Sequence, residues 1–333
     1  MASRPMIRTL AIAAAGLLAL SACGESGSSG SGGTGEESAA SGEACVGIAG
    51  EELVVLEDDK SLQTVDNIIP AVSAAAATPE LLAALDAVSA ALTTDDLIAL
   101  NAAVDIDRGD PAEVAGEFLA DVDVPTGGSG TIVVGGANFT ESQVLANVYA
   151  QALTTAGFSA SVASVGNREI YLPALQAGQE IQVFPEYVGT LTENLNVAAN
   201  GEGADPLASS DLDETVANLT TLGEPVGLVF GQPAEAADQN AFAVTQAFAD
   251  ELGVTTLSEL ADACGDGSLT LGGPTECPTR PFCQLGLEET YGLQFAGFNP
   301  YDTGGPLTKA AIQAGEVSMG LVFSSDAVFA SAG

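Results

Sequence analysis

The chain has 333 residues, with 45 Asp and Glu against 7 Lys and Arg, a formal net charge of −38 and no His. The lack of His excludes imidazole acid–base catalysis, Ser-His-Asp and Cys-His nucleophiles, and every zinc site with a His ligand. Phosphate backbones would repel so acidic a surface, which excludes nucleic acid as a partner. Hydrophobic residues make up 47% of the chain, so we expect it to fold into one or two domains.

The N-terminus has the pattern of a secretory signal that ends in a lipidation site. Two arginines precede an apolar run, Leu10–Leu20, which is too short to span a membrane as a mature helix. The ending Leu20-Ser21-Ala22-Cys23 resembles the bacterial lipoprotein processing site, which implies a lipid on Cys23. We therefore expect residues 1–22 to be a lipoprotein signal peptide and the protein to be anchored outside the cytoplasmic membrane. An uncleaved membrane anchor is the alternative.

The next two segments differ sharply in composition. Residues 23–44 are rich in Gly, Ser and Glu, and we expect a flexible tether because such a composition cannot bury a core. Residues 45–124 contain one apolar, strand-like run, Leu53–Leu56, and are otherwise mostly helical. Helix start signals stand at Thr78-Pro79, Thr94-Asp95-Asp96 and Asp110-Pro111. Residues 125–130, with Pro and three Gly, are expected to form a linker.

Four cysteines follow the lipidation site, and outside the cell an even number favours disulfides over metal. Four cysteines allow three connectivities. The loop between Cys277 and Cys283 is short and stiffened by Pro, which favours a bond between these two and leaves Cys45 to pair with Cys264. A Cys₄ zinc site is the alternative, although two of the spacings lack the close pairs that such sites use.

From residue 131 onward, strand-like and helix-like segments alternate. Strands are expected at Thr131–Val134, Ser159–Val165, Ile181–Phe184, Pro225–Phe230, Leu269–Gly272 and Met319–Phe323. Helices are expected from Thr140 to Gly157 and at Arg168–Ala177, Ala241–Leu252, Leu257–Cys264 and Thr308–Ala314. This alternation predicts an α/β fold with parallel strands and helices on both faces, arranged in two lobes.

Three polar or aromatic clusters come where expected strands end. The carboxyl ends of strands are where open α/β sheets bind ligands, so these clusters are candidate site residues. The side chains concerned are Asn138, Phe139, Thr140, Tyr187, Thr190, Asp238 and Asn240. An ordinary structural role is the alternative, because Thr140, Glu186 and Asp238 are also suited to capping the helices that follow.

Five ordered motifs between residues 131 and 330 carry a resemblance to a known family. They are TIVVGGANFTESQVLANVYAQAL, VFPEYVGTL, DQNAFAV, PTECPTRPFCQLGLEETYGL and GLVFSSDA. Together they resemble the substrate-binding proteins of glycine betaine, choline and related osmoprotectant ABC transporters. The resemblance implies a type II periplasmic-binding-protein fold, in which two α/β lobes close on a ligand. It also implies a permease with a cytoplasmic ATPase as partner, and neither an enzymatic activity nor a cofactor.

Residues 45–124 also resemble the family, but they resemble the stretch that normally ends such proteins, after the strand written here as Gly320–Ser325. We therefore predict a circularly permuted chain, which is tolerable because chain ends commonly lie close together at the surface. In this prediction residues 45–124 complete lobe 1, Leu53–Leu56 adjoins the lobe that contains Thr131–Val134, and Gly50 lies near Ala330. The remaining boundaries are 131–235 for lobe 1, 236–305 for lobe 2, and 306–333 for the crossover and return to lobe 1.

The resemblance also implies roles for single residues. Family members hold the quaternary ammonium in an aromatic cage, because ring faces attract a cation that cannot donate hydrogen bonds. Tyr187 matches a cage tyrosine, Thr190 a ligand-bonding threonine and Asp238 an acidic site residue. The resemblance adds an aromatic, Phe323, and an arginine, Arg280, which is suited to a ligand carboxylate and also to neutralising Glu276. Asn240 stands where members often have a cage tyrosine, so a full four-ring cage is hard to assemble.

The sequence therefore predicts a lipid-anchored binding protein for a small cationic or zwitterionic osmolyte, such as glycine betaine, choline, carnitine or proline betaine. A protein of the same fold for an amino acid or primary amine is one alternative, and a surface sensor without a transport role is another. A hydrolase with Glu186 and Asp238 as its carboxylate pair is a third alternative that nothing in the sequence demands. No metal is expected.

Overall fold

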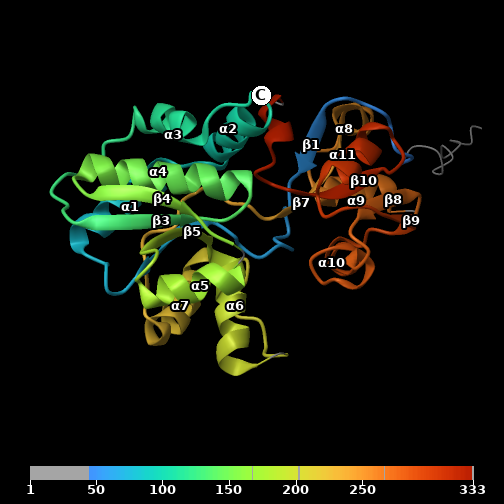
Figure 1. Cartoon of the computed structure of the whole chain (residues 1–333). Helices are drawn as coiled ribbons and strands as arrows, with labels where there is room; N and C mark the ends of the chain where they lie inside the picture. Colours follow the sequence, from blue (N-terminus) through green and yellow to red (C-terminus); the bar gives the residue numbers. More distant parts are fainter. Residues whose placement is uncertain (1–44, 167, 202, 266, 332–333) are drawn as a thin grey trace, which may run out of the picture. The chain divides into compact units, whose positions relative to one another are not determined.

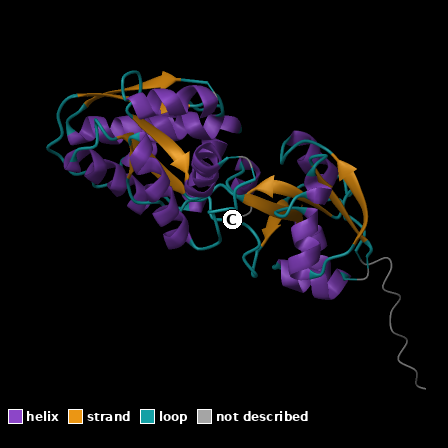
Figure 2. Cartoon of the chain, turned by 90° about the horizontal axis from the view of Figure 1, so that it is seen from below, coloured by secondary structure: helices purple, strands orange, loops and turns teal. Residues whose placement is uncertain are grey.

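A computed structural model of the chain describes residues 45–331 apart from 167, 202 and 266. The expected signal peptide, the tether and Cys23 lie outside the described residues. The described part contains two five-stranded sheets with helices packed against them (Figure 1; Figure 2). The α/β class is the one that the alternation of segments predicted, but the expected parallel sheets are wrong, because both sheets also contain antiparallel pairs.

The first sheet has the strand order β4-β3-β5-β2-β6. Its strands are β2 (Ile68–Ser73), β3 (Thr131–Gly136), β4 (Ser159–Ser164), β5 (Val183–Tyr187) and β6 (Leu228–Phe230). β3 runs parallel to β4 and β5, whereas β2 runs antiparallel to both of its neighbours. β2 is buried along its whole length. It was not among the expected strands, because its Pro and its lack of alternation hide the strand pattern.

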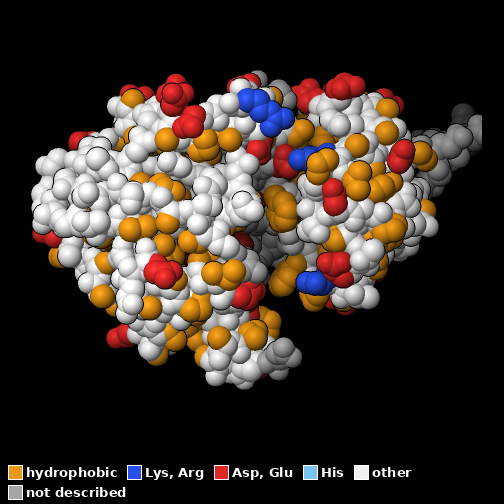
Figure 3. Space-filling model, in the orientation of Figure 1, with side chains coloured by type: hydrophobic (Ala, Val, Ile, Leu, Met, Phe, Trp, Pro, Cys, Tyr) orange, Lys and Arg blue, Asp and Glu red, His pale blue; other side chains and the backbone are white. Residues whose placement is uncertain are grey.

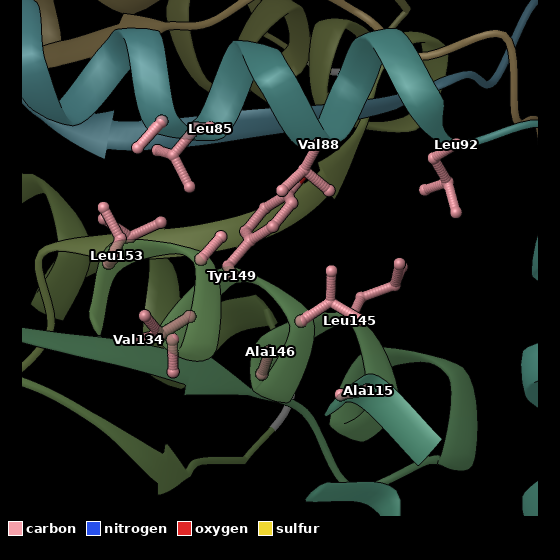
Figure 4. Packing of buried hydrophobic residues seen from close by; sticks show 14 of the residues in the cluster. Leu85, Val88, Leu92, Ala115, Val134, Leu145, Ala146, Tyr149 and Leu153 are labelled. Carbon is pink, nitrogen blue, oxygen red and sulfur yellow. The ribbon is translucent and has the colours of Figure 1, made fainter. Parts of the chain in front are cut away.

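Helices cover both faces of this sheet. One face packs against α1 (Pro79–Ala91), α2 (Thr94–Asp105), α3 (Pro111–Leu119) and α4 (Thr140–Ala156), and the other against α5 (Arg168–Ala177), α6 (Val188–Asn200) and α7 (Leu212–Gly223). In the first layer, Leu85 and Val88 of α1 point toward Leu145 and Tyr149 of α4, as Figure 4 shows. All four side chains are almost fully buried, so this seam fixes α4 across the sheet.

The second sheet has the strand order β1-β7-β10-β8-β9. Its strands are β1 (Leu53–Leu56), β7 (Asn240–Thr245), β8 (Leu269–Gly273), β9 (Phe295–Pro300) and β10 (Met319–Phe323). Helices α8 (Gln246–Leu252), α9 (Leu257–Cys264), α10 (Gln284–Gly286) and α11 (Pro306–Gln313) accompany it. The expected helix over 241–252 is therefore wrong in its first half, because residues 240–245 form a central strand. That strand is buried on both faces, and a short apolar run without alternation fits a helix equally well.

Two of the expected lobe assignments are also wrong. β1 is not part of the sheet that contains β3; it pairs antiparallel with β7 in the second sheet, with Leu53 opposite Thr245. Residues 306–323 likewise stay with the second sheet, and only the C-terminal turn, Ala327–Ser331, packs against α2. The strand run alone could not decide between the sheets, because either sheet can bury Leu53 and Leu56, which lie on opposite faces of β1.

The disulfides explain why the segment before β1 belongs with the second sheet. Cys45 is bonded to Cys264 at the end of α9, and Cys277 is bonded to Cys283. Both pairings are those expected from the spacing. Since the four cysteines of the described chain are joined in this way, none is left to ligate a metal.

Two segments run between the sheets and lie side by side. Residues 57–67 join β1 to β2, and residues 231–239 join β6 to β7. They meet at a β-bridge between Asn67 and Ala237, and the Asp238 N–H donates to the carbonyl of Asp66. The carboxyl groups of Asp66 and Asp238 are therefore placed on the connecting segments themselves.

Candidate functional site

Most of the predicted site residues line two cavities that share the ring of Phe139. The first, which we call the acidic cavity, has a volume of about 480 Å³ and is lined by Asn101, Asp105, Ile106, Phe139, Thr140, Glu141, Asp238, Lys309, Phe323, Ser325, Asp326, Ala327 and Val328. The second, the aromatic cavity, has a volume of about 550 Å³ and is lined by Ala137, Asn138, Phe139, Gly166, Arg168, Ile170, Tyr171, Phe184 and Tyr187. The Phe139 side chain is 48% exposed, so its ring is available at both mouths.

Four aromatic side chains border the aromatic cavity, although Asn240 contributes none of them. Tyr171 of α5 stacks on Phe184 of β5, with ring centroids 3.8 Å apart and planes at 9°. Tyr187 ends β5, and Phe139 precedes the first turn of α4. The end of β5 and the starts of two helices thus bring these rings together, which is a set of faces suited to a cation.

Arg168, at the start of α5, lies in this cavity but already has a carboxylate partner. Its Nη2 is 2.9 Å from Oε2 of Glu186, a carboxylate on β5 that is fully buried. The Tyr171 hydroxyl donates to the other oxygen of Glu186 at 2.7 Å. Glu186 is therefore held in an ion pair and does not act as the helix cap that its position suggested.

The acidic cavity is organised around the carboxylate of Glu141 in the first turn of α4. Its side chain accepts hydrogen bonds from the Tyr187 hydroxyl at 2.5 Å and from Asn101 Nδ2 at 2.7 Å. The same Asn101 nitrogen donates to the carbonyl of Ser325 at 2.9 Å. Burial raises the pKa of Glu141 and raises that of Tyr187 further above its usual range.

Asp238 borders the same cavity from the second connecting segment. The Ser325 hydroxyl donates to Asp238 Oδ1 at 2.8 Å. Burial raises the pKa of Asp238 to about 8, and the negative charge of Glu141 adds to this shift. Two carboxyl groups thus share one small space without a cation between them.

The other predicted residues divide among different places. Phe323 lines the acidic cavity, whereas Asn240 and Arg280 line a separate cavity of about 150 Å³ next to the Cys277–Cys283 disulfide. Arg280 Nη2 is 3.8 Å from Glu276 Oε1, the structural partner foreseen in the sequence. Thr190 is exposed, and its N–H and hydroxyl both donate to Asp66. Thr140 bonds to Asp105 rather than capping its helix.

Several residues of the two cavities were not singled out in the sequence. Glu141 follows Thr140 in the motif that begins with Thr131. Its position in the first turn of a helix after a strand could have indicated a site residue. Tyr171, Phe184 and Arg168 come together only through the pairing of strands, so the linear pattern held no comparable sign of them. Asn101 belongs to the 45–124 block and is 224 residues from its partner Ser325.

Comparison with known proteins settles the family. The family model described as "Substrate binding domain of ABC-type glycine betaine transport system" matches residues 47–121 and 130–333, which is most of the chain. The chain belongs to this family. It is therefore an extracytoplasmic solute-binding component of an ABC importer of the glycine betaine type, not an enzyme, with a permease as its partner. The family expected from the five motifs is confirmed.

Other comparisons add little to this assignment. One solved structure, titled "Crystal structure of glycine betaine/carnitine/choline ABC transporter", aligns with 19% sequence identity over 60% of this chain and 70% of that chain, at a TM-score of 0.45. No curated protein sequence matches the chain. In the part of the chain that the structure describes, no helix combines the length and apolarity needed to cross a bilayer.

The buried ion pair of Arg168 with Glu186 yields a stability prediction. Glu186→Gln leaves the Arg168 charge without its partner in a largely desolvated place, so we expect the free energy of unfolding to fall by about 3 kcal/mol. The matched control is Glu276→Gln, which removes an exposed and longer ion pair and should cost less than about 1 kcal/mol. Urea unfolding of the three proteins measures both values, and equal losses would contradict this account of Glu186.

Proposed function

We propose that this binding protein captures a small quaternary ammonium compound in the aromatic cavity and the adjoining acidic cavity. The observation that carries the proposal is the set of rings from Phe139, Tyr171, Phe184 and Tyr187 around one space. A methylated ammonium donates no hydrogen bond, so ring faces and nearby carboxylates are the groups that attract it. The loaded protein would deliver its ligand to a permease driven by a cytoplasmic ATPase.

Phe139 offers a direct test, because its exposed ring can be removed with little effect on the core. Phe139→Ala should weaken binding of choline or glycine betaine by about threefold to thirtyfold, which corresponds to one lost cation–π contact. The control is Phe282→Ala, a ring that is 38% exposed and lines only the separate cavity beside Arg280. Calorimetric titration measures the affinities, and an equal loss in both variants would count against the aromatic cavity.

We also propose that the protein is a lipoprotein held at the membrane through Cys23. Support comes from the basic start, the short apolar run and the Leu20-Ser21-Ala22-Cys23 ending in the sequence. Residues 23–44 would then act as a tether, and a single lipidated terminus would keep the binding site close to the permease.

The lipid anchor is tested by removing the modified residue. Cys23→Ala should abolish incorporation of labelled fatty acid and move the protein from the detergent phase to the aqueous phase in a phase-separation assay. Cys45→Ser serves as the control, because it removes a cysteine engaged in a disulfide and should leave the lipid in place. Labelled fatty acid on the Cys23→Ala protein would refute the proposed site.

We further propose that the chain is a circular permutation of the usual family order. The motifs of residues 45–124 resemble the C-terminal part of family members, as described above. The strand order of the first sheet supports this proposal. β2 belongs to residues 45–124, yet it lies between β5 and β6, which come from the later part of the chain. Val54 and Val55 of β1 line one further cavity of about 670 Å³ together with Phe329 and Ala330 of the C-terminal turn. The C-terminal turn therefore lies beside the strand that follows the N-terminal segment, and a linker can join the two segments.

A rearranged chain tests the permutation. Residues 130–333, followed by a short Gly-Ser linker and then residues 45–124, should fold with both disulfides and bind the same ligand as the natural order. Circular dichroism, mass analysis of the disulfides and ligand titration provide the measurements. The control is a chain of the same residues whose new ends lie within α4. It should fail to fold, because that helix packs in the hydrophobic core against the first sheet. Failure of both rearranged chains alike would contradict the proposal.

A further inference from the structure

The acidic cavity contains more carboxyl groups than it can neutralise. Four Asp and Glu side chains line it against a single cation, Lys309. The Lys309 Nζ is 2.5 Å from Asp326 Oδ2, so this cation is already paired. The face of the protein drawn in Figure 3 likewise shows few basic side chains among more numerous acidic ones. A ligand carboxylate would find no unpaired cation among the described residues that line this cavity.

Among the described residues, only neutral groups donate hydrogen bonds to the carboxyl groups of Glu141 and Asp238. Glu141 accepts from Tyr187 and Asn101, and Asp238 accepts from Ser325. The Ser325 hydroxyl also interacts with Glu141. Since one hydroxyl has one hydrogen, it cannot donate to both carboxylates at once, so Ser325 satisfies only one of the two at a time.

A further buried atom at the same place lacks a partner. Asn101 is 5% exposed and lines the cavity, and its Oδ1 has no hydrogen-bond donor among the described residues. A buried amide oxygen without a donor is costly, and a ligand hydroxyl or a proton in this network would offset that cost. This acceptor therefore favours a ligand that brings positive charge or a donor rather than more acceptors.

The negative charges around Glu141 and Asp238 all favour the protonated form of this pair. Asp66 on the first connecting segment and Asp326 after β10 face Asp238 along with Glu141, and each raises its pKa beyond the effect of burial. Asp326 has the same effect on Glu141, and Tyr187 on β5 and Ser325 after β10 contribute only neutral hydroxyls. The pair therefore retains a proton near neutral pH.

We propose that this site selects a net cation, a quaternary ammonium alcohol without a carboxylate, and that the cation displaces a proton from the Glu141 and Asp238 pair. The inference rests on the proposed function and narrows its ligand class. A zwitterion would place its carboxylate against unneutralised carboxyl groups, which weakens its binding. The released proton makes binding of the cation depend on pH, because the empty site is protonated and the occupied site is not.

The test is calorimetric titration of the full chain in detergent with choline and with glycine betaine at pH 6, 7 and 8, in two buffers of different protonation enthalpy. Choline should bind more tightly as pH rises, by about tenfold between pH 6 and 7, with release of close to one proton. Glycine betaine should bind at least about tenfold more weakly than choline at pH 7.

Equal or tighter binding of glycine betaine, or choline binding without proton release, overturns the inference but leaves the proposed function intact. Absence of binding by both ligands contradicts the proposed function and this inference with it.

Variants distinguish loss of proton release at this site from a general effect on the structure. Asp238→Asn and Glu141→Gln should each abolish most of the proton release and narrow the preference for choline over glycine betaine. Asp250→Asn, on the exposed surface of α8, is the matched control and should keep both properties. If Glu141→Gln does not fold, Asp238→Asn alone decides, and retention of full proton release in it overturns the inference.

Discussion

The hydrogen-bond network on Glu141 is the constraint on which the binding region depends. A buried carboxyl group is stable only if other groups satisfy it, and here the donors come from α2 and from the end of β5. Asn101 extends the same network to the carbonyl of Ser325, just after β10 of the second sheet. Four parts of the chain that are distant in sequence thus converge on one side chain, and the cavity walls follow from their positions.

The same network gives the Tyr187 ring its orientation, because its hydroxyl is fixed by Glu141 while its ring borders the aromatic cavity. The Arg168–Glu186 ion pair plays a comparable part for Tyr171, whose hydroxyl it also engages. Ring positions are therefore set by buried acids behind them. Of these two acids, Glu186 is neutralised by Arg168, so only Glu141 can add to the negative potential that a cation meets on entry.

Much of the fold was predictable from the sequence, because long periodic helices and capped starts carry local signals. The starts of α1, α2 and α3 and the strands β3, β8 and β10 lie where their patterns placed them, and the family followed from motifs spread over 200 residues. The sheet assignment of β1 and the strand nature of residues 240–245 were not predictable, since both depend on which distant apolar surface is covered. The same reason applies to the site: Tyr187 and Asp238 stood in motifs, but Asn101 and Tyr171 join them only through tertiary packing.

The Cys45–Cys264 bond has a mechanical consequence for the proposed attachment of the chain through Cys23. A pull on that end reaches the protein at Cys45, eight residues before β1 begins. Without the bond, the load would pass through the few hydrogen bonds of residues 45–50 to β1, an edge strand whose one neighbour in the sheet is β7. With the bond, the force enters α9 covalently and bypasses the edge of the sheet. Force applied through the proposed lipid anchor would therefore enter the second sheet away from the residues that line the binding cavities.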